Sequence, residues 1–267
     1  MDEIKRNLKG AYTIWLRDLT RYARDRARIL TSLAQPMLYL VIFGTGFSAM
    51  LRGGNANLGD INFQTFMYPG IIGMTVMFTS IFSAISIVFD REFGFLKEVM
   101  VAPVSRIAVA LGKVAGGSTV ALIQGCIVLL LAPLLGVNFT FPQLLQMLGL
   151  MIVLAAVVTS LGILIAARQH SFEGFQFVIN FLMMPMFLLS GALFPLTGLP
   201  GWMATLVRFN PVAYAMDALR QTALSGAVPA GFLDQLSLRS VFADVMYLFG
   251  FGVLFLIPAV WAFSKQD

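Results

Sequence analysis

Side chains that could act as nucleophiles or metal ligands are few and scattered in this sequence. It has one cysteine, Cys126, and one histidine, His170. One residue of each kind is too little for a structural or catalytic metal site. Cys126 lies in an apolar run and is interpreted as a packing residue, and His170, close to Glu173, as a surface-loop residue. An intramembrane enzyme would need a nucleophile, an acid–base pair or a metal cluster, and the sequence offers no such set.

Composition places the chain in a membrane. Of its 267 residues, 58% are hydrophobic and 12% are charged, whereas an ordinary soluble domain carries roughly 25% charged residues. The mean hydropathy is +0.85, and apolar runs of about 20 residues, the length that crosses a hydrocarbon core, recur along the chain. The isoelectric point of about 9.6 does not indicate nucleic-acid binding, because the basic residues stand at the ends of the apolar runs and form no patch of their own.

We expect an all-α membrane protein in which residues 1–28 form an amphipathic interfacial helix and residues 29–267 a single six-span domain. The first 28 residues combine an apolar stripe at helical spacing with a basic remainder, which is typical of a helix lying on anionic lipid. A soluble N-terminal tail is the alternative. No cleavable signal peptide is expected, because a long charged segment precedes the first apolar run. The stripe consists of Ile4, Leu8, Tyr12, Trp15, Leu19 and Tyr22.

Six apolar runs predict the membrane spans. Proline and glycine interrupt the chain after the fifth run, which predicts a broken or re-entrant piece over residues 191–207. Residues 208–240 are expected to be a polar segment. Gly112 and Gly116 indicate close contact with another helix. The expected spans are residues 29–50, 66–89, 107–135, 144–167, 177–190 and 241–263.

The distribution of Lys and Arg predicts that both termini lie in the cytoplasm, because cytoplasmic loops carry an excess of basic residues. In that orientation eight basic residues of segment 1–28, four of segment 90–113, Arg168 and Lys265 lie inside, fourteen in all. Only four, Arg52, Arg208, Arg220 and Arg239, lie outside.

The segment between the second and third expected spans is the most informative one. Phe93, Leu96 and Met100 share one face at helical spacing, and Pro103 stops the helix. A short amphipathic helix on the cytoplasmic surface could offer this face to a partner protein. A solvated linker that carries topogenic charge explains the same pattern.

Several short motifs in this segment and beyond the fifth span occur together. Arg91, Gly94, Glu98, the run Ala102-Pro103-Val104-Ser105, Gly112 and Lys113 form one group. Ser190-Gly191 to Trp202, followed by Phe209-Asn210-Pro211, Tyr214, Asp217 and Arg220, forms the other. In this order, over nearly the whole chain, they resemble the coupling-helix region and the broken extracellular element of type-2 ABC exporter permeases, which carry drugs, polysaccharides or lipo-oligosaccharides.

The resemblance implies that the chain is half of a transport pathway and pairs with a second permease copy. A separate P-loop ATPase would bind ATP and Mg, and this chain has no phosphate-binding Gly-x-x-x-x-Gly-Lys-Ser/Thr loop of its own. Arg168 and Glu173 are a hypothetical second contact with that ATPase. The residues expected to couple to the ATPase are Arg91, Glu92, Phe93, Gly94, Leu96, Lys97, Glu98, Met100 and Pro103. Those expected to close the outer mouth are Gly191, Phe194, Pro195, Pro200 and Trp202.

Two other functions remain open from the residues alone. An ion-coupled transporter would place ionisable residues near the bilayer midplane, and here they lie near the expected span ends. A membrane assembly factor would use the same docking helix without transport. The family assigns spans one, two and five to the path. Small polar and Met side chains there would suit an amphipathic substrate, although ordinary helix packing is the better explanation of them. The expected lining residues are Thr75, Thr79, Ser83 and Met183.

Overall fold

The computed structural model describes residues 2–53, 63–92, 104–135, 137–169, 171–194, 196–226, 233 and 237–264. Helices dominate the described residues, which contain no β-strand. In chain order the helices are α1 (Asp2–Arg24), α2 (Arg26–Gly53), α3 (Phe63–Ser83), α4 (Ile85–Glu92), α6 (Arg106–Leu130), α7 (Phe141–Ala166), α8 (Phe172–Leu188), α9 (Gly201–Arg208), α10 (Pro211–Leu224) and α12 (Val241–Ser264).

Four segments of the described chain are long and apolar enough to cross a membrane. They are Phe66–Glu92, which joins α3 and α4, Arg106–Leu130, Phe141–Ala166 and Val241–Ala262. Helix α8 is a shorter apolar helix, and α2 covers the position of the first expected span. The order of helices therefore follows the predicted order, with four candidate spans among the described residues.

Some helix boundaries differ from the prediction. The helix expected over residues 1–28 ends at Arg24, and α2 begins two residues later. The third expected span ends at Leu130, and a 3₁₀ turn, Ala132–Leu135, follows because Pro133 cannot continue the helical hydrogen bonding. Helix α7 begins after Thr140, whose side chain forms a capping box with Gln143.

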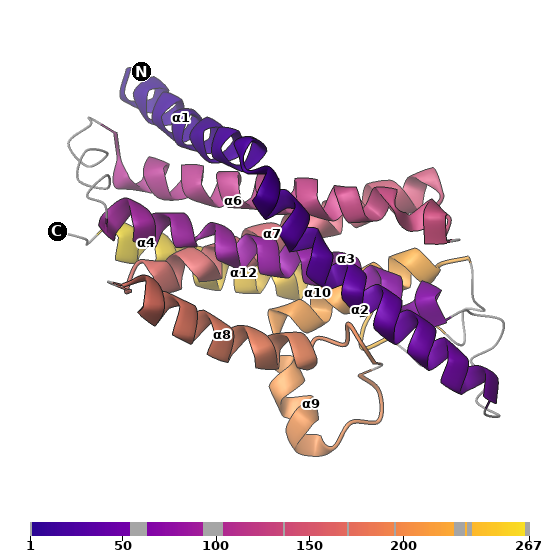
Figure 1. The fold of residues 1–267 in the computed structure, drawn as a ribbon. Coiled ribbons are helices and arrows are strands. Elements are labelled where there is room, and N and C mark those ends of the chain that lie inside the picture. Colours follow the sequence, from indigo (N-terminus) through magenta and orange to yellow (C-terminus); the bar gives the residue numbers. More distant parts are fainter. Residues whose placement is uncertain are drawn as a thin grey trace.

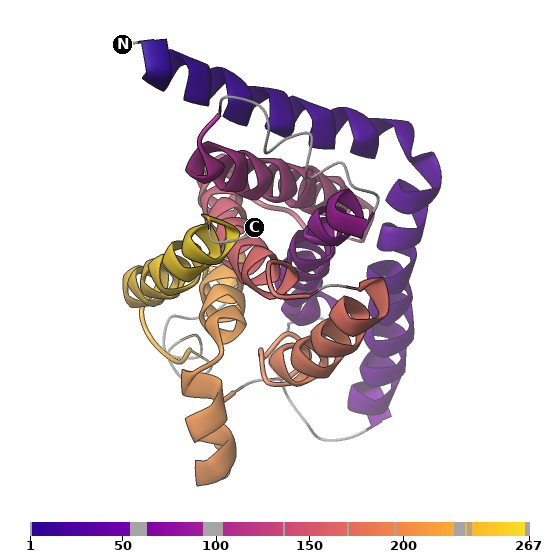
Figure 2. The ribbon, with the colours of Figure 1, turned by 90° about the vertical axis from the view of Figure 1, so that its left-hand side faces the viewer.

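Helix α7 lies at the centre of the bundle. It packs against α3, α6, α10 and α12, and Met147, Met151 and Leu154 on it are fully buried. Helix α1 lies across one face, along α6, and α2 continues down an adjacent side (Figure 1, Figure 2). Helix α9 projects from the bundle in both views. The start of α1 and the end of α12 lie toward the same end of the bundle (Figure 1).

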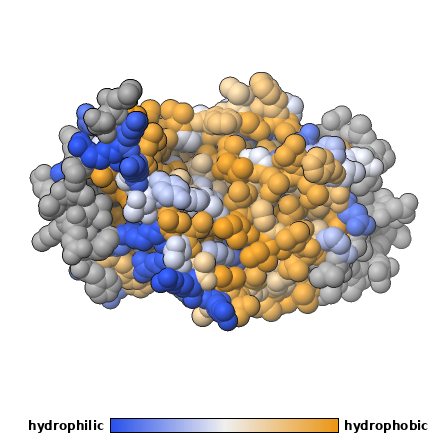
Figure 3. Space-filling model, turned by 90° about the horizontal axis from the view of Figure 1, so that it is seen from above, coloured by the Kyte–Doolittle hydropathy of each residue, from blue (hydrophilic) through white to orange (hydrophobic). Residues whose placement is uncertain are grey.

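The surface carries the apolar band that a membrane requires. Hydrophobic residues cover its middle, and most of the hydrophilic residues in this view lie toward the end where α1 starts (Figure 3). Helix α12 contributes many exposed apolar side chains, because only 11% of the most apolar stretch of Val241–Ala262 is buried inside the protein. Exposed Phe249, Leu254 and Ile257 are side chains that face lipid at low cost and water at high cost.

The stripe predicted on the first helix is divided by the structure. Ile4, Leu8 and Tyr12 are exposed, whereas Tyr22 is buried and Trp15 donates a hydrogen bond to Thr119 on α6. The split follows from packing, since Trp15 and Tyr22 bond to side chains of α6, whereas no described helix covers Ile4, Leu8 and Tyr12. The exposed residues remain available for the predicted contact with lipid.

Candidate functional site

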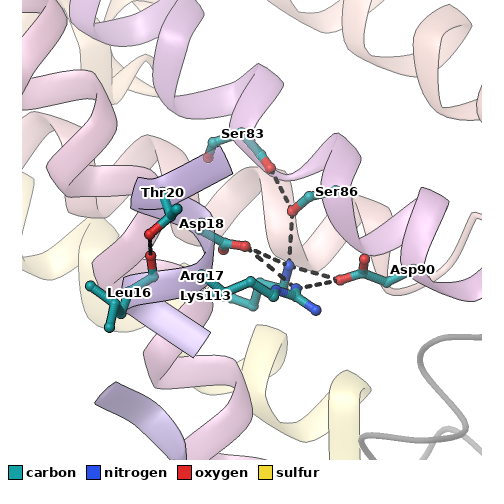
Figure 4. A network of polar contacts seen from close by, with 8 residues as sticks. All are labelled: Leu16, Arg17, Asp18, Thr20, Ser83, Ser86, Asp90 and Lys113. Atoms are coloured by element: carbon teal, nitrogen blue, oxygen red, sulfur yellow. Dashed lines mark hydrogen bonds and ion pairs between the residues drawn. The ribbon is translucent and has the colours of Figure 1, made fainter. Parts of the chain in front are cut away.

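Four charged side chains meet where α1, α4 and α6 come together, and we call them the base cluster: Arg17, Asp18, Asp90 and Lys113 (Figure 4). Lys113 Nζ lies 2.9 Å from Asp90 Oδ2 and 3.3 Å from Asp18 Oδ1. It also donates a hydrogen bond of 3.0 Å to Ser86 Oγ. Arg17 Nη2 lies 2.8 Å from Asp90 Oδ2. Two cations therefore balance two carboxylates.

Burial makes this balance necessary. The Lys113 side chain is only 4% exposed and that of Asp90 10%. A charge removed from water is tolerated when it is paired and hydrogen-bonded, and removing one partner from such a pair costs about 3–5 kcal/mol. Separating any of the three helices would therefore cost a large part of the free energy of unfolding. Lys113 was part of the predicted motif, but its partners lie 23 and 95 residues away.

The close packing of α1 on α6 depends on glycine. A Cβ atom on Gly112 would lie 2.7 Å from the carbonyl oxygen of Ala11, and one on Gly116 would lie 3.1 Å from Asp18 Cβ. The predicted close helix contact at these two glycines is confirmed, and the partner is α1 of the same chain. Without side chains at these positions α1 comes near enough for Asp18 to reach Lys113.

Arg91 ties the end of α4 to a different helix. Its guanidinium donates to backbone carbonyls at the end of α7, to Ala167 at 3.0 Å, to Ala166 at 3.5 Å and to Gln169. The last carbonyls of a helix lack partners within the helix and carry its negative dipole end, so a cation is favoured there. Asp90 and Arg91, adjacent in sequence, thus hold α4 between the base cluster and α7.

The chain that follows α4 is attached to α1 at its far end as well. The backbone N–H of Ser105 donates to Asn7 Oδ1 at 2.8 Å, and Val104 packs against Gly10. Ser105 then caps α6 by accepting from the N–H of Ala108. Residues 93–103 therefore begin and end at contacts with α1, made by Arg17 on one side and by Asn7 on the other.

Most residues predicted to contact an ATPase belong to this segment. Phe93, Gly94, Leu96, Lys97, Glu98, Met100 and Pro103 lie outside the described residues, as does His170. Of the remaining two, Glu92 is exposed at the end of α4 and Arg91 binds α7. Glu173 lies in the first turn of α8. The structure thus describes the residues that flank this segment, and the role of the segment in coupling stays a prediction.

A cavity of about 270 Å³ lies between α2 and α3. Thr75 and Thr79, two of the predicted lining residues, belong to its wall with Phe78 and Phe82. Ser83 borders a separate small cavity of about 30 Å³ beside Asp18. Met183 is buried in the core and borders neither. The four residues therefore do not share one space, and their lining role stays a prediction.

The other set of predicted residues follows α8. Gly191 is buried with a φ of 78°, a backbone conformation that favours glycine, and a Cβ there would also meet Leu196. Phe194 is half-buried, Pro200 precedes α9, and Trp202 is 65% exposed. Pro195 lies outside the described residues. Of the predicted gate residues that the structure describes, Gly191 alone is buried.

The prediction of a polar segment over residues 208–240 is wrong for its first part. Residues Pro211–Leu224 form α10, a helix whose side chains are almost all buried between α3, α7 and α12. Its start was readable from the sequence, since Asn210 caps the helix by accepting from the N–H of Val212 and Pro211 follows. The burial of α10 could not be predicted from the sequence, because Asp217 and Arg220 make the segment look polar.

Two side chains of this region hold the broken segment in place. Arg220 is 3% exposed, donates to the carbonyl of Gly191 and lies 4.3 Å from the centre of the Phe66 ring. Asn210 Nδ2 donates to the carbonyl of Met186 at 2.7 Å. The Met186 carbonyl in the last turn of α8 is thus satisfied by the cap of α10, and the Gly191 carbonyl beyond that helix by α10 itself. Burial lowers the pKa of Arg220 to about 10, which leaves it cationic at neutral pH.

Most of the chain is similar to known proteins. Residues 10–224 match the family model described as ABC-2 type transporter. The transport permease ycf38 of Cyanophora paradoxa is 31% identical over 195 residues, which are 72% of this chain and 66% of that protein. Nodulation protein J of Rhizobium leguminosarum bv. trifolii is 28% identical over 218 residues, 80% of this chain and 81% of that protein. This chain spans about two thirds of the length of the ycf38 relatives.

Proposed function

Because the chain belongs to the ABC-2 type transporter family and is therefore a membrane-embedded transport permease, we propose that it is the permease subunit of an ATP-driven exporter. Permeases of this family work with a separate ATPase subunit, which would bind ATP and Mg, and this chain carries no catalytic role in the proposal. The substrate would be amphipathic or hydrophobic, such as a drug, glycolipid or polysaccharide, and would leave the cytoplasm or the inner leaflet.

One observation carries the coupling part of the proposal. Asp90 and Arg91 precede residues 93–103 and Ser105 follows them, and all three of these flanking residues are bound to other helices. From Asn7 to Arg17 is ten residues, about 15 Å along a helix. Helix α1 therefore spans both ends of the segment. A force applied to the segment by an ATPase would move α1, α4 and α6 together rather than bend one loop.

The same contacts define the path along which a movement of residues 93–103 would pass to the other helices. Asp90 connects the segment to α6 through Lys113, and Arg91 connects it to the central helix α7. Buried paired charges resist separation, because each would lose its partner in a medium of low dielectric. ATP-driven movement at residues 93–103 would thus reach the middle of the bundle. Predicted contact residues such as Leu96, Lys97 and Glu98 would receive it.

The cavity between α2 and α3 supports an amphipathic cargo. Its wall combines aromatic rings with the hydroxyl groups of Thr75 and Thr79, a mixture that accepts both an apolar chain and a polar group. Gly191 and the segment up to Trp202, held by Arg220, would close the outer mouth. In this proposal, opening the mouth requires α10 and the end of α8 to separate.

The proposed setting is the inner cell membrane, with six spans, both termini in the cytoplasm and a second permease copy as partner. Helices α2 and α8 would complete the six spans. The position of the start of α1 and the end of α12 toward the same end of the bundle supports the topology (Figure 1), as does the excess of basic residues predicted on that side. The exposed apolar face at the start of α1 would lie on lipid.

Affinity purification tests this proposal. The tagged chain is extracted from its native host in mild detergent, and associated proteins are identified by mass spectrometry with ATP hydrolysis measured. We expect a P-loop ATPase in about equal amount. Glu98→Arg and Leu96→Pro should reduce its recovery, because they alter the charge and the helix of the predicted contact. Asp60→Arg, a matched charge reversal in the loop expected on the opposite side, should not.

Two results would count against the proposal. Recovery of the chain alone under several gentle conditions would favour an ion-coupled transporter or an assembly factor. Equal recovery of the ATPase with all three variants would keep the exporter but remove residues 93–103 as its docking segment.

A further inference from the structure

Two buried carboxyl groups meet where α10 contacts the start of α12. Asp217 on α10 is 4% exposed and Asp244 on α12 is 0% exposed. The two groups share one neighbour, because Gln221 Nε2 lies 3.0 Å from Asp217 Oδ2 and 3.5 Å from Asp244 Oδ2. They come from two different helices, so the packing of α10 on α12 brings them together. We call them the carboxyl pair.

The two carboxyl groups differ in their hydrogen-bond donors. Asp217 Oδ2 accepts from the backbone N–H groups of Leu238 at 2.8 Å and Arg239 at 3.3 Å, and from Gln221 Nε2 at 3.0 Å. Asp244 Oδ2 has only a long contact of 3.5 Å with the same Gln221 nitrogen. Asp244 Oδ1 is buried and has no donor among the residues that the structure describes. One donor is therefore missing at Asp244.

The nearby cations do not supply the missing donor. Arg220 donates to the Gly191 carbonyl and lies over the Phe66 ring, and the Arg239 guanidinium lies 4.6 Å from the centre of the Tyr247 ring. The ion pairs within 4.0 Å found in the described part of the chain all belong to the base cluster.

Most of the helices packed around the pair bring no charge to it. Helix α7, which packs against both α10 and α12, and α3, which packs against α10, contain no Asp, Glu, Lys, Arg or His. Helix α6, which packs against α12, carries Arg106 and Lys113, and Lys113 is bound to Asp18 and Asp90 in the base cluster. Tyr214 on α10 donates its hydroxyl proton to the Arg208 carbonyl, and the Tyr247 ring stacks on the Tyr214 ring. Two carboxylates facing each other in such a setting repel, and burial penalises both charges.

We propose that Asp217 and Asp244 bind one proton between them at neutral pH, and that this shared proton fastens the start of α12 to α10. The proton comes from water and returns to water, with no other reactant. It supplies the donor that Asp244 lacks and removes one of two like charges. Burial also raises the pKa of Asp217, although the backbone N–H groups of Leu238 and Arg239 oppose this. The proposal does not depend on the ATPase partner.

The carboxyl pair would act as a pH-sensitive latch. Asp217 also holds the backbone of residues 238–239, so the pair joins three parts of the chain: α10, the turn before α12, and α12 itself. An unfolded Asp loses its proton near pH 4, whereas the folded pair would keep one to higher pH. The stabilisation is then complete at low pH and is lost as the pH rises through the value at which the pair releases its proton.

Infrared spectroscopy of the full-length chain in lipid bilayers tests the shared proton. The probe is the proton itself, and the signal is the C=O stretch of a protonated carboxylic acid, assigned by ¹³C-labelled aspartate. We expect this band at pH 7 and its loss as the pH rises toward 10. Asp244→Asn and Asp217→Asn should each abolish it, since either removes the pair. Asp25→Asn, at the exposed junction of α1 and α2, should retain it.

The effect on stability gives a second readout. The folding constant of the wild type should fall with rising pH relative to Asp244→Asn, by at most about tenfold per pH unit for one proton. The amide of Asn donates a hydrogen bond without charge, so this variant should keep the latch closed at all pH values. A labelled wild-type spectrum without a protonated aspartate at pH 7 would overturn the proposal, even if a variant failed to fold. So would a band that persists in both Asn variants.

Discussion

The base cluster and the carboxyl pair use the same residue types at opposite extremes of charge balance. Lys113 and Arg17 neutralise Asp90 and Asp18 at one place. At the other, Asp217 and Asp244 face each other while the nearest arginines bind a carbonyl and aromatic rings. The difference shows that the position of a carboxylate near a helix end does not by itself reveal its role in the fold. Its partners decide whether it fastens helices permanently or only while it holds a proton.

The largest effect is expected from removing the central cation of the base cluster. Lys113→Met keeps the length of the side chain but leaves two buried carboxylates with Arg17 alone. We expect a loss of about 3–5 kcal/mol in the free energy of unfolding, or failure to accumulate in the membrane. Thermal unfolding of the purified protein measures this loss, with Lys5→Met on the exposed start of α1 as the matched control.

The base cluster predicts a specific rescue of that variant. Adding Asp90→Asn to Lys113→Met removes one uncompensated charge, so the double variant should be more stable than the single one, which a double-mutant cycle quantifies. Strictly additive losses would mean that Lys113 and Asp90 do not depend on each other.

The carboxyl pair should respond differently when its neighbouring cation is removed. Arg220→Met leaves the Gly191 carbonyl without its donor, and an unsatisfied buried polar group costs about 1–3 kcal/mol. Because Arg220 is not paired with Asp217, the protonated-carboxyl band should persist in this variant. Disappearance of the band would show that protonation of the carboxyl pair depends on Arg220. The pair would then depend on a neighbouring cation, as the base cluster does.

A smaller effect is expected where glycine lets α1 approach the base cluster. Gly112→Ala puts a Cβ 2.7 Å from the Ala11 carbonyl oxygen, so α1 must shift, at a cost of about 1–3 kcal/mol. Gly149→Ala on α7 is the matched control, because nothing lies within 4 Å of its added Cβ. It should be neutral or slightly stabilising, since alanine favours a helix. Equal melting temperatures for the two variants would contradict the close packing.

The sequence alone was sufficient for the family and for an all-helical membrane protein. These depend on local signals, namely apolar length, proline and glycine. It did not reveal the burial of α10, because Asp217, Arg220 and Gln221 give that helix a polar composition and their partners lie on other elements. It named Lys113 but not Asp18, since no local pattern links residues 95 positions apart.

The amphipathic stripe shows the same limit on a smaller scale. Helical spacing correctly grouped Ile4, Tyr12 and Tyr22 on one side of the helix. It could not tell that Tyr22 bonds to Gln124 of α6 while Ile4 stays exposed, because the contact depends on where α1 crosses its neighbour.

Site-specific photo-cross-linking in the native host tests the central claim, that an ATPase docks on residues 93–103 beside the base cluster. A photoreactive amino acid replaces Leu96 in one strain and Asn55, in the loop expected on the opposite side, in another. Captured proteins are identified by mass spectrometry. The account predicts that position 96 captures a P-loop ATPase and position 55 does not. Capture of no ATPase at position 96, or equal capture at both positions, would contradict it.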